Sequence, residues 1–258
     1  MIDTHCHLID PQFKRDIKEV IVRAQSAGLR KIINIGYDLK TSCSAIEMYK
    51  EYQWILPAIG IHPNETAGES IAYLKEIDNL CTNERVFAVG ETGLDYYRNF
   101  SPKDAQVVLF RRHINIARKY NLPLIVHTRN AVEDAIRILK EEDYHLGVFH
   151  CYNGTYEQAK RIIDIGYYLG FGGVLTFSKN LREVFQRVPL DFVIFETDAP
   201  FLAPAGYRGK RNEPGYIFET AKVAASLKGL SLDEIEMITD RNASRLFSIE
   251  EKTLTDNG

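Results

Sequence analysis

The chain has 258 residues, of which 45% are hydrophobic and 26% are charged, so it can build a large apolar core and is neither disordered nor collagen-like. Its 32 basic and 35 acidic residues leave a net charge of −3, which excludes a general basic coat for holding nucleic acid. The sequence contains no run near the roughly 20 apolar residues of a membrane span, no signal-type start and no CxxC pair among its four cysteines. We therefore expect a cytoplasmic protein without disulfides or membrane contact.

Eight short hydrophobic runs recur along the chain, and each is followed by a longer segment with helical spacing. Most of these runs are almost continuously apolar, which is typical of parallel strands covered on both faces. The alternation therefore predicts repeated βα units. The expected strands are Ile2 to His5, Lys31 to Gly36, Trp54 to Gly60, Val86 to Glu91, Leu124 to His127, Leu146 to His150, Tyr167 to Phe171 and Phe192 to Asp198.

The segment after residue 100 illustrates the helices that we expect between the strands. Ser101 is expected to cap this helix, with Pro102 in its first position. Apolar positions then return every three or four residues, so one helix face should pack on the sheet. Eight such units without a linker predict an α/β fold, a (β/α)8 TIM barrel forming one domain over residues 1–258, with disorder after about residue 250. A doubly wound sheet is the alternative, because counting units does not prove closure.

Five of the eight runs end in residues that can bind a metal ion. These residues are His5, His7, Glu91, His127, His150 and Asp198. In a barrel the carboxyl ends of all strands meet at one mouth, where the active sites of this fold lie. Side chains spread over nearly 200 positions of the sequence are therefore expected to converge there.

His5 and His7 stand two residues apart at a strand end, so both rings should point to the same side while Cys6 points away. A lone HxH pair is a weak signal, and a single strand-end histidine is more often a hydrogen-bonded core residue. Six coincident positions are different, since burying four imidazoles and two acids without a partner costs several kcal/mol per ion. This number of donors exceeds what one tetrahedral zinc ion needs and predicts a site for two divalent ions.

The same segments resemble the TatD family of metal-dependent deoxyribonucleases, which are barrel hydrolases of the amidohydrolase type. The resemblance covers nearly the whole chain in order, and GETGLDYY and RGKRNEP are its most specific motifs. The matching segments are DTHCHL from Asp3, GIHP from Gly60, VGETGLDYY from Val89, PLIVHTR from Pro123, FHCYNG from Phe149, ETDAPFL from Glu196, RGKRNEP from Arg208 and NASRLF from Asn242.

This resemblance implies that the two metal ions share Glu91 as a bridging ligand. One ion would be held by His5, His7, Glu91 and Asp198, and the other by Glu91, His127 and His150. It also implies a hydrolase that cleaves the phosphodiester bonds of DNA with metal-activated water, with 3′-to-5′ exonuclease action on single strands or frayed ends. Glu91 and Asp198 are the expected catalytic residues, and Asp198 is placed to orient that water or take its proton.

A second group of residues is expected to contact the substrate. It comprises His62, Arg129, Arg208, Lys210 and Arg211. The three cations after the eighth run lie where barrels often bind phosphate, and Tyr96, Tyr97 and Phe201 offer faces for base stacking. Glu213 provides a competing ion-pair partner for Arg211. Two further histidines, His113 and His145, lie away from the strand ends and are interpreted as structural.

Two other functions remain open from the sequence. A barrel of the same class could hydrolyse a small amide, lactone or cyclic imide, because a fold does not determine a substrate. Many binuclear members of that class bridge their metals with a modified lysine, whereas Glu91 occupies this place here, which favours the nuclease. A catalytically silent barrel that binds nucleic acid or protein is the third possibility, and the intact ligand set argues against it. The donors admit Mg²⁺, Mn²⁺ or Zn²⁺, and a monomer is the default expectation.

Overall fold

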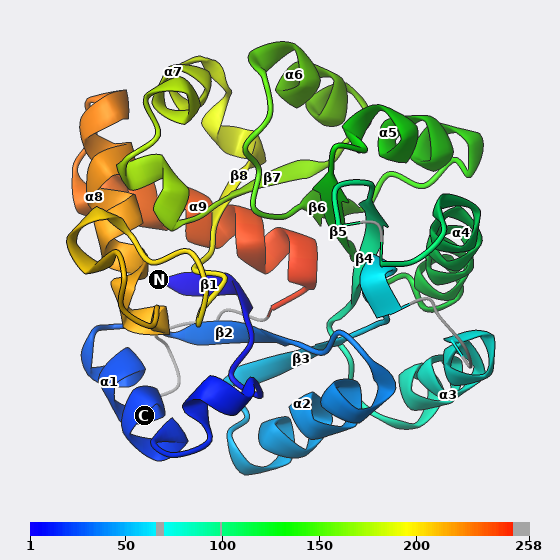
Figure 1. The fold of residues 1–258 in the computed structure, drawn as a ribbon. Coiled ribbons are helices and arrows are strands. Elements are labelled where there is room, and N and C mark those ends of the chain that lie inside the picture. The colour runs from blue at the N-terminus through cyan, green and yellow to red at the C-terminus, as the bar shows by residue number, and fades with distance from the viewer. Residues whose placement is uncertain (66–69, 99, 250–258) are drawn as a thin grey trace, which may run out of the picture.

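The computed structural model describes residues 1–65, 70–98 and 100–249. Within these residues, eight parallel strands form one sheet in the order β1 to β8, so each strand pairs with its neighbour in the sequence (Figure 1). The strands are β1 (Ile2–Cys6), β2 (Lys31–Ile35), β3 (Ile55–Ile59), β4 (Ala88–Asp95), β5 (Leu124–Arg129), β6 (Gly147–Phe149), β7 (Tyr168–Phe171) and β8 (Val193–Phe195).

The sheet closes between β1 and the chain that leaves β8. Cys6 and Ala199 form a parallel bridge, and the Asp198 N–H donates to the His5 carbonyl at 2.9 Å. The Thr4 hydroxyl also donates to the Phe195 carbonyl at 2.9 Å. These contacts complete a (β/α)8 TIM barrel, which confirms the predicted fold class and excludes the doubly wound sheet.

Helices surround the strands on the outside, and one helix covers an end of the barrel (Figure 1). The α-helices are α1 (Ile17–Ser26), α2 (Leu39–Glu51), α3 (Ser70–Asn83), α4 (Lys103–Tyr120), α5 (Val132–Glu141), α6 (Tyr156–Asp164), α7 (Lys179–Arg187), α8 (Ile217–Lys228) and α9 (Leu232–Phe247). In Figure 1, α9 crosses behind the strands. Its Asp240 accepts the N–H of Ile2 at 2.8 Å, so α9 closes the amino end of the strands and leaves the other end for the site.

Apolar side chains pack in two layers. Alternate strand residues such as Ile33, Ile125 and Ile194 fill the barrel and meet Leu246 and Phe247 of α9. The intervening strand residues pack outward against the helices. The strands are therefore buried on both faces, as their continuous hydrophobic runs predict.

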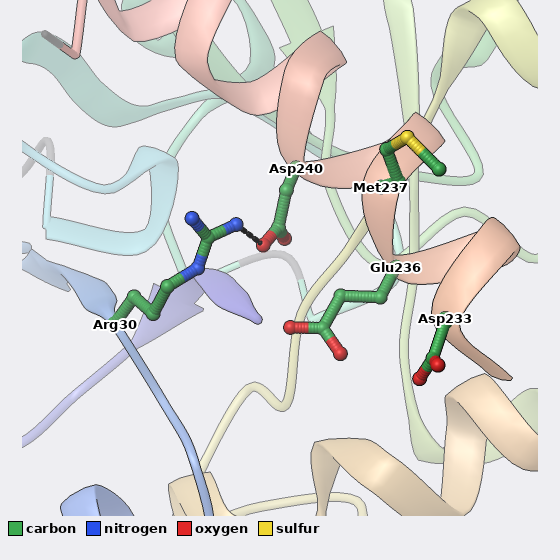
Figure 2. A pocket seen from close by; sticks show the side chains of 5 residues that line it. All are labelled: Arg30, Asp233, Glu236, Met237 and Asp240. Atoms are coloured by element: carbon green, nitrogen blue, oxygen red, sulfur yellow. Dashed lines mark hydrogen bonds and ion pairs between the residues drawn. The ribbon is translucent and has the colours of Figure 1, made fainter. Parts of the chain in front are cut away.

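The amino end of the barrel carries charged residues over a shallow cavity of about 420 Å³ (Figure 2). Arg30 forms an ion pair with Asp240 there, and Glu236 pairs with the amino group of Met1. Asp240 is 2% exposed and bonds both Arg30 and the β1 backbone. These contacts tie α9 to the start of the sheet.

Several local details differ from the sequence predictions. Strand β4 continues four residues past Glu91 to Asp95, because Gly93 and His127 pair across β4 and β5. Helix α4 begins at Lys103, so Pro102 and not Ser101 takes the N-cap position, without a side-chain capping hydrogen bond. The Ser101 carbonyl accepts a hydrogen bond from the Gln106 side chain. The expected disorder after residue 250 lies outside the described residues. Among those that are described, no helix is both long and apolar enough to cross a membrane.

Candidate metal centre

The first two histidines meet at the mouth of the barrel. His5 lies within β1 and His7 directly after it, and their Nε2 atoms are 3.2 Å apart. Cys6 points to the opposite side, where its thiol faces the Ala199 carbonyl at 3.6 Å. The alternation of side chains along the strand thus brings two imidazole nitrogens to one point, as predicted.

Glu91 faces two separate pairs of histidines with its two carboxylate oxygens. Its Oε2 lies 3.5 Å from His5 Nε2 and 3.6 Å from His7 Nε2. Its Oε1 lies 2.8 Å from His127 Nδ1 and 2.9 Å from His150 Nε2. One side chain from the middle of β4 therefore connects donors from β1 with donors from β5 and the end of β6.

Asp198 completes the donor group on the side of His5 and His7. Its Oδ1 lies 3.7 Å from His5 Nε2 and 3.5 Å from His7 Nε2. Ligands about 2.1 Å from a central ion at the corners of a tetrahedron are about 3.4 Å apart. The five separations that join His5 and His7 to each other, to Glu91 and to Asp198 lie between 3.2 and 3.7 Å, close to this value. These side chains are therefore candidates to hold one divalent cation.

The other side of Glu91 holds a smaller group of donors. His127 Nδ1 lies 3.2 Å from His150 Nε2, and both face the same carboxylate oxygen. His62 adds its Nε2 at 3.5 Å from Glu91 Oε1. The His62 Nδ1 accepts the Asn64 N–H at 3.0 Å, so the proton of the neutral ring lies on Nε2. In this tautomer His62 is a hydrogen-bond donor toward the centre and not a metal ligand.

The charges of the centre follow from burial and from these close contacts. Burial favours the neutral acid at Glu91, but His150, His62 and His127 together outweigh burial and hold the pKa of Glu91 well below its usual range. Burial also disfavours a charged His150, yet Glu91 and Glu196 outweigh it and raise the pKa of His150. Burial lowers the pKa of His62 to about 3, so this ring is neutral. Glu91 is therefore an anion facing several imidazoles.

The donor set fits a metal better than a hydrogen-bonded core. In both histidine pairs two imidazole nitrogens lie 3.2 Å apart, and an oxygen of Glu91 lies beside each pair. Several atoms that can bind a metal therefore converge at each of these two places. The far nitrogens His5 Nδ1, His127 Nε2 and His150 Nδ1 are buried without a hydrogen-bond partner among the described residues. Two overlapping trios of these side chains have donor atoms within 4.8 Å of one another: His5, His150 and Asp198, and His5, His7 and Glu91. A third trio within this distance is His62, Glu91 and His127, but its His62 Nε2 carries a proton and is a hydrogen-bond donor.

Cations and aromatic rings lie around the mouth. The Arg129 guanidinium lies 4.0 Å above the ring of Tyr97, which is 61% exposed. Arg208 lies 4.5 Å above the ring of Phe177. Phe201 is 44% exposed, and its ring centre is 6.0 Å from that of His7. These exposed rings offer flat apolar faces close to positive charge.

The other residues expected to contact substrate differ in whether ion pairs or hydrogen bonds within the protein already engage them. Lys210 is exposed and forms no ion pair within the described part of the chain. Arg211 is committed to Asp16 at 2.7 Å and to Glu213 at 2.9 Å, which is the competing interaction that the sequence suggested. Tyr96 donates its hydroxyl to Asp134 at 3.1 Å, and this bond together with burial raises the pKa of Tyr96 to about 12.

Two buried acids were missed by the sequence reasoning. Asp95 Oδ2 lies 3.5 Å from His127 Nε2, and Glu196 Oε1 lies 3.7 Å from His150 Nδ1. Each approaches the ring nitrogen that faces away from Glu91. Both acids stand in the quoted motifs GETGLDYY and ETDAPFL, and Glu196 is two residues before Asp198. The motifs mark these positions, but their contacts with histidines come only from the fold.

A (β/α)8 barrel with a His, Glu and Asp cluster at the carboxyl ends of its strands defines a metal-dependent hydrolase. The family described as TatD related DNase matches residues 2–248. The chain therefore belongs to the TatD related DNase family, as its motifs indicated.

Three proteins illustrate the similarity. The uncharacterized metal-dependent hydrolase YabD of Bacillus subtilis strain 168 is 43% identical over 256 residues, which cover 96% of this chain and 99% of that protein. The 3′-5′ ssDNA/RNA exonuclease TatD of Klebsiella pneumoniae strain 342 is 31% identical over 259 residues, covering 97% and 98%. The crystal structure of YjjV, a TatD homologue from Escherichia coli K12, has 30% identity and a TM-score of 0.93 and covers 97% of this chain and 98% of its own.

Proposed function

We propose that the chain binds two divalent cations, Mg²⁺, Mn²⁺ or Zn²⁺, and hydrolyses phosphodiester bonds of single-stranded DNA from the 3′ end. The observation that carries this proposal is the division of the Glu91 carboxylate, with one oxygen toward His5 and His7 and the other toward His127 and His150. A carboxylate shared in this way would supply one oxygen to each of two cations.

Six side chains would hold the two cations. His5, His7, Asp198 and one oxygen of Glu91 would bind the first, and His127, His150 and the other oxygen of Glu91 would bind the second. Divalent cations in such a site lower the pKa of water and offset the negative charge of a phosphate. Asp198 is an anion at the mouth, since His7 and His5 outweigh burial and lower the pKa of its carboxyl. It can therefore orient the attacking water or accept its proton.

The surroundings of the centre favour a phosphate substrate. His62 presents an Nε2–H toward the mouth and can donate to a phosphate oxygen or to the leaving oxygen. Arg129, Arg208 and Lys210 are exposed cations in segments that follow the strand ends, and they could contact the phosphates of a nucleic acid strand. Arg211, held by Asp16 and Glu213, is proposed to position the loop that carries Arg208 and Lys210.

The strand preference rests on the aromatic rings. Base–aromatic stacking contributes about 1–3 kcal/mol per base and requires unstacked bases, which single strands and frayed ends provide. Tyr97 and Phe201 expose such faces near the centre. The name of the Klebsiella relative, an exonuclease for single-stranded DNA and RNA, agrees with this preference.

The cysteines of the described chain are all free, which agrees with the proposed cytoplasmic location.

The test is cleavage of a 5′-end-labelled single-stranded DNA oligonucleotide by metal-stripped protein. Mg²⁺, Mn²⁺ or Zn²⁺ is added back, and matched duplex DNA and single-stranded RNA are run in parallel. We expect a ladder that shortens from the 3′ end only when metal is present. Glu91→Ala should remove cleavage because it loses the ligand shared by both cations. Asp198→Asn keeps the shape of the side chain but loses its charge, so it should lower the rate by at least about 100-fold with the fold retained.

Two outcomes would contradict the proposal. An Asp198→Asn protein with unchanged turnover would remove the assigned role of this carboxylate. A protein that binds two cations but cleaves none of the nucleic acids would contradict the nuclease and favour the alternative, a hydrolase of small amides, lactones or cyclic imides. Short labelled products that appear before the products shortened by one or a few nucleotides would exclude the exonuclease mode.

A further inference from the structure

The two histidine pairs differ in what lies behind the rings. His127 directs Nδ1 toward Glu91 and leaves Nε2 at 3.5 Å from Asp95 Oδ2. His150 directs Nε2 toward Glu91 and leaves Nδ1 at 3.7 Å from Glu196 Oε1. Both members of this pair are thus backed by a carboxylate.

The other pair has no such carboxylates among the described residues. His7 Nδ1 lies 3.2 Å from the backbone oxygen of Ile35, and His5 Nδ1 is buried without a hydrogen-bond partner. Among the described residues, carboxylates therefore approach the far ring nitrogens of His127 and His150 but not those of His5 and His7.

Asp95 is held in place by its own loop. It is 1% exposed, and its Oδ1 accepts the N–H groups of Tyr97 and Arg98, both at 2.9 Å. Its Oδ2 accepts the side-chain amide of Asn64 at 3.0 Å and is the oxygen that faces His127. The carboxylate therefore has a defined direction.

Glu196 is buried to a similar degree and is less well satisfied. It is 1% exposed, and its Oε1 accepts the Cys151 N–H at 2.6 Å. Its Oε2 has no hydrogen-bond partner in the described chain, and a methyl group on Gly170 would lie 2.3 Å from it. A buried carboxylate in so tight a space needs a hydrogen-bond donor, and Nδ1 of the His150 ring lies 3.7 Å from it.

A metal ion supplies the reason for this arrangement. An imidazole that binds a cation through one nitrogen keeps its proton on the other, and this buried N–H needs an acceptor. A carboxylate acceptor fixes the ring and makes the near nitrogen a stronger ligand. The separations of 3.5 and 3.7 Å exceed a hydrogen bond of about 3.0 Å by roughly half an ångström, and contacts of this kind tighten when a site is loaded.

We propose that Asp95 and Glu196 are positioning residues that hold His127 and His150 for one cation and make the two cation positions unequal. Cation binding at the site formed by His127 and His150 depends on the two carboxylates. Cation binding at the site formed by His5 and His7 does not. This inference rests on the proposed two-cation site, but not on the choice of substrate.

The test is calorimetric titration of Zn²⁺ into the metal-stripped full chain in the presence of a competing chelator. The variants are Asp95→Asn and Glu196→Gln, which keep shape and remove charge. Each should weaken one of the two binding steps by about 10- to 100-fold and leave the other within about threefold. A His127→Ala protein lacks a ligand of the site formed by His127 and His150. The binding step that this protein loses is the step that the two variants should weaken.

The matched control is Asp240→Asn, which removes a buried carboxylate at the opposite end of the barrel (Figure 2). It should lower the melting temperature without changing either binding step, so loss of stability alone is separated from loss of positioning. Equal weakening of both steps by the Asp95 and Glu196 variants, or no weakening, would overturn the inference. A wild-type chain that binds fewer than two Zn²⁺ ions would overturn the two-cation site with it. If the variants weaken only one of the two Zn²⁺ binding steps but the protein does not cleave DNA, the proposed substrate is rejected and the positioning role is kept.

Discussion

His113 and His145 show that surroundings decide the role of a histidine. His113 lies in α4, where its Nδ1–H donates to the Leu109 carbonyl at 2.9 Å and its Nε2 accepts the Ile61 N–H at 3.1 Å. Both ring nitrogens are thus satisfied in the neutral form. His145 bonds Asp143 at 2.7 Å on the surface. Their structural interpretation from the sequence agrees with these contacts.

His113 makes the stability of the fold depend on pH. Burial lowers its pKa to about 4, although the Leu109 carbonyl acts in the opposite direction, and the unfolded ring titrates near 6.5. The folded state therefore binds fewer protons between these values. The free energy of unfolding should be highest above pH 6.5 and fall by up to about 3 kcal/mol as the pH drops to 4, with no further loss from this group below.

Urea unfolding of wild type and His113→Gln at pH 7.5, 6.0 and 5.0 measures this contribution. The variant should be less stable at pH 7.5 but should lose less stability on acidification than wild type. His145→Gln, at a ring that is 55% exposed, controls for replacing a histidine by glutamine and should change the free energy of unfolding at pH 7.5 by less than about 0.5 kcal/mol. Parallel pH profiles for wild type and His113→Gln would contradict the assignment.

Strand β4 positions the central ligand because its backbone lies very close to β5. Gly93 has a φ of +133° and pairs with His127, and a methyl group there would lie 2.2 Å from the His127 carbonyl oxygen. Only glycine permits both this conformation and this approach. Gly93 in the motif around Glu91 is therefore required for the close packing of β4 against β5.

Gly93→Ala should separate β4 from β5 beside two ligands. Strain and crowding together should lower the free energy of unfolding by about 2–4 kcal/mol and reduce the number of metal ions bound per chain. Gly206→Ala is the matched control, because nothing lies within 4 Å of its added methyl group, and it should change stability by less than about 0.5 kcal/mol. Urea midpoints and metal analysis after dialysis measure both effects. A Gly93→Ala protein that keeps wild-type stability and metal content would refute the explanation.

At the scale of the whole molecule, the centre connects strands that start far apart in the sequence. The ligands come from β1, β4, β5 and the segments after β6 and β8. A cation bound there links these strand ends and binds the folded chain better than the unfolded chain. Metal at about 100 times its dissociation constant should therefore stabilise the fold by about 2.7 kcal/mol.

This stabilisation should shrink as the pH falls. Burial lowers the pKa values of His7, His127 and His150, but nearby carboxylates outweigh burial and raise all three. Below these raised values the metal-free rings hold protons that a cation must displace, so acid weakens metal binding. Melting temperatures with Mn²⁺ and with EDTA should differ more at pH 8 than at pH 6. An equal difference at both pH values would show that binding displaces no protons.

The fold and the convergence of His5, His7, Glu91, His127, His150 and Asp198 could be predicted because both follow from patterns among neighbouring residues. Continuous apolar runs followed by helical spacing specify strands covered on both faces, and the barrel then brings the ends of those strands together. Helix α4 packs the expected face, including Leu109 and Ile114, even though its first residue was misplaced. The exact strand ends, such as the extension of β4 to Asp95, depend on pairing with β5 and have no local signal.

The sequence by itself determined the barrel, the family and the residues that converge at the mouth, because periodicity and motifs are properties of neighbouring residues. The tertiary structure alone decided that Glu91 divides its oxygens between two histidine pairs and that Asp95 and Glu196 stand behind one of them. It also decided that Arg211 is held by Asp16, 195 positions away in the chain. These are contacts between side chains from distant segments, whose distances are set by the packing of the whole barrel.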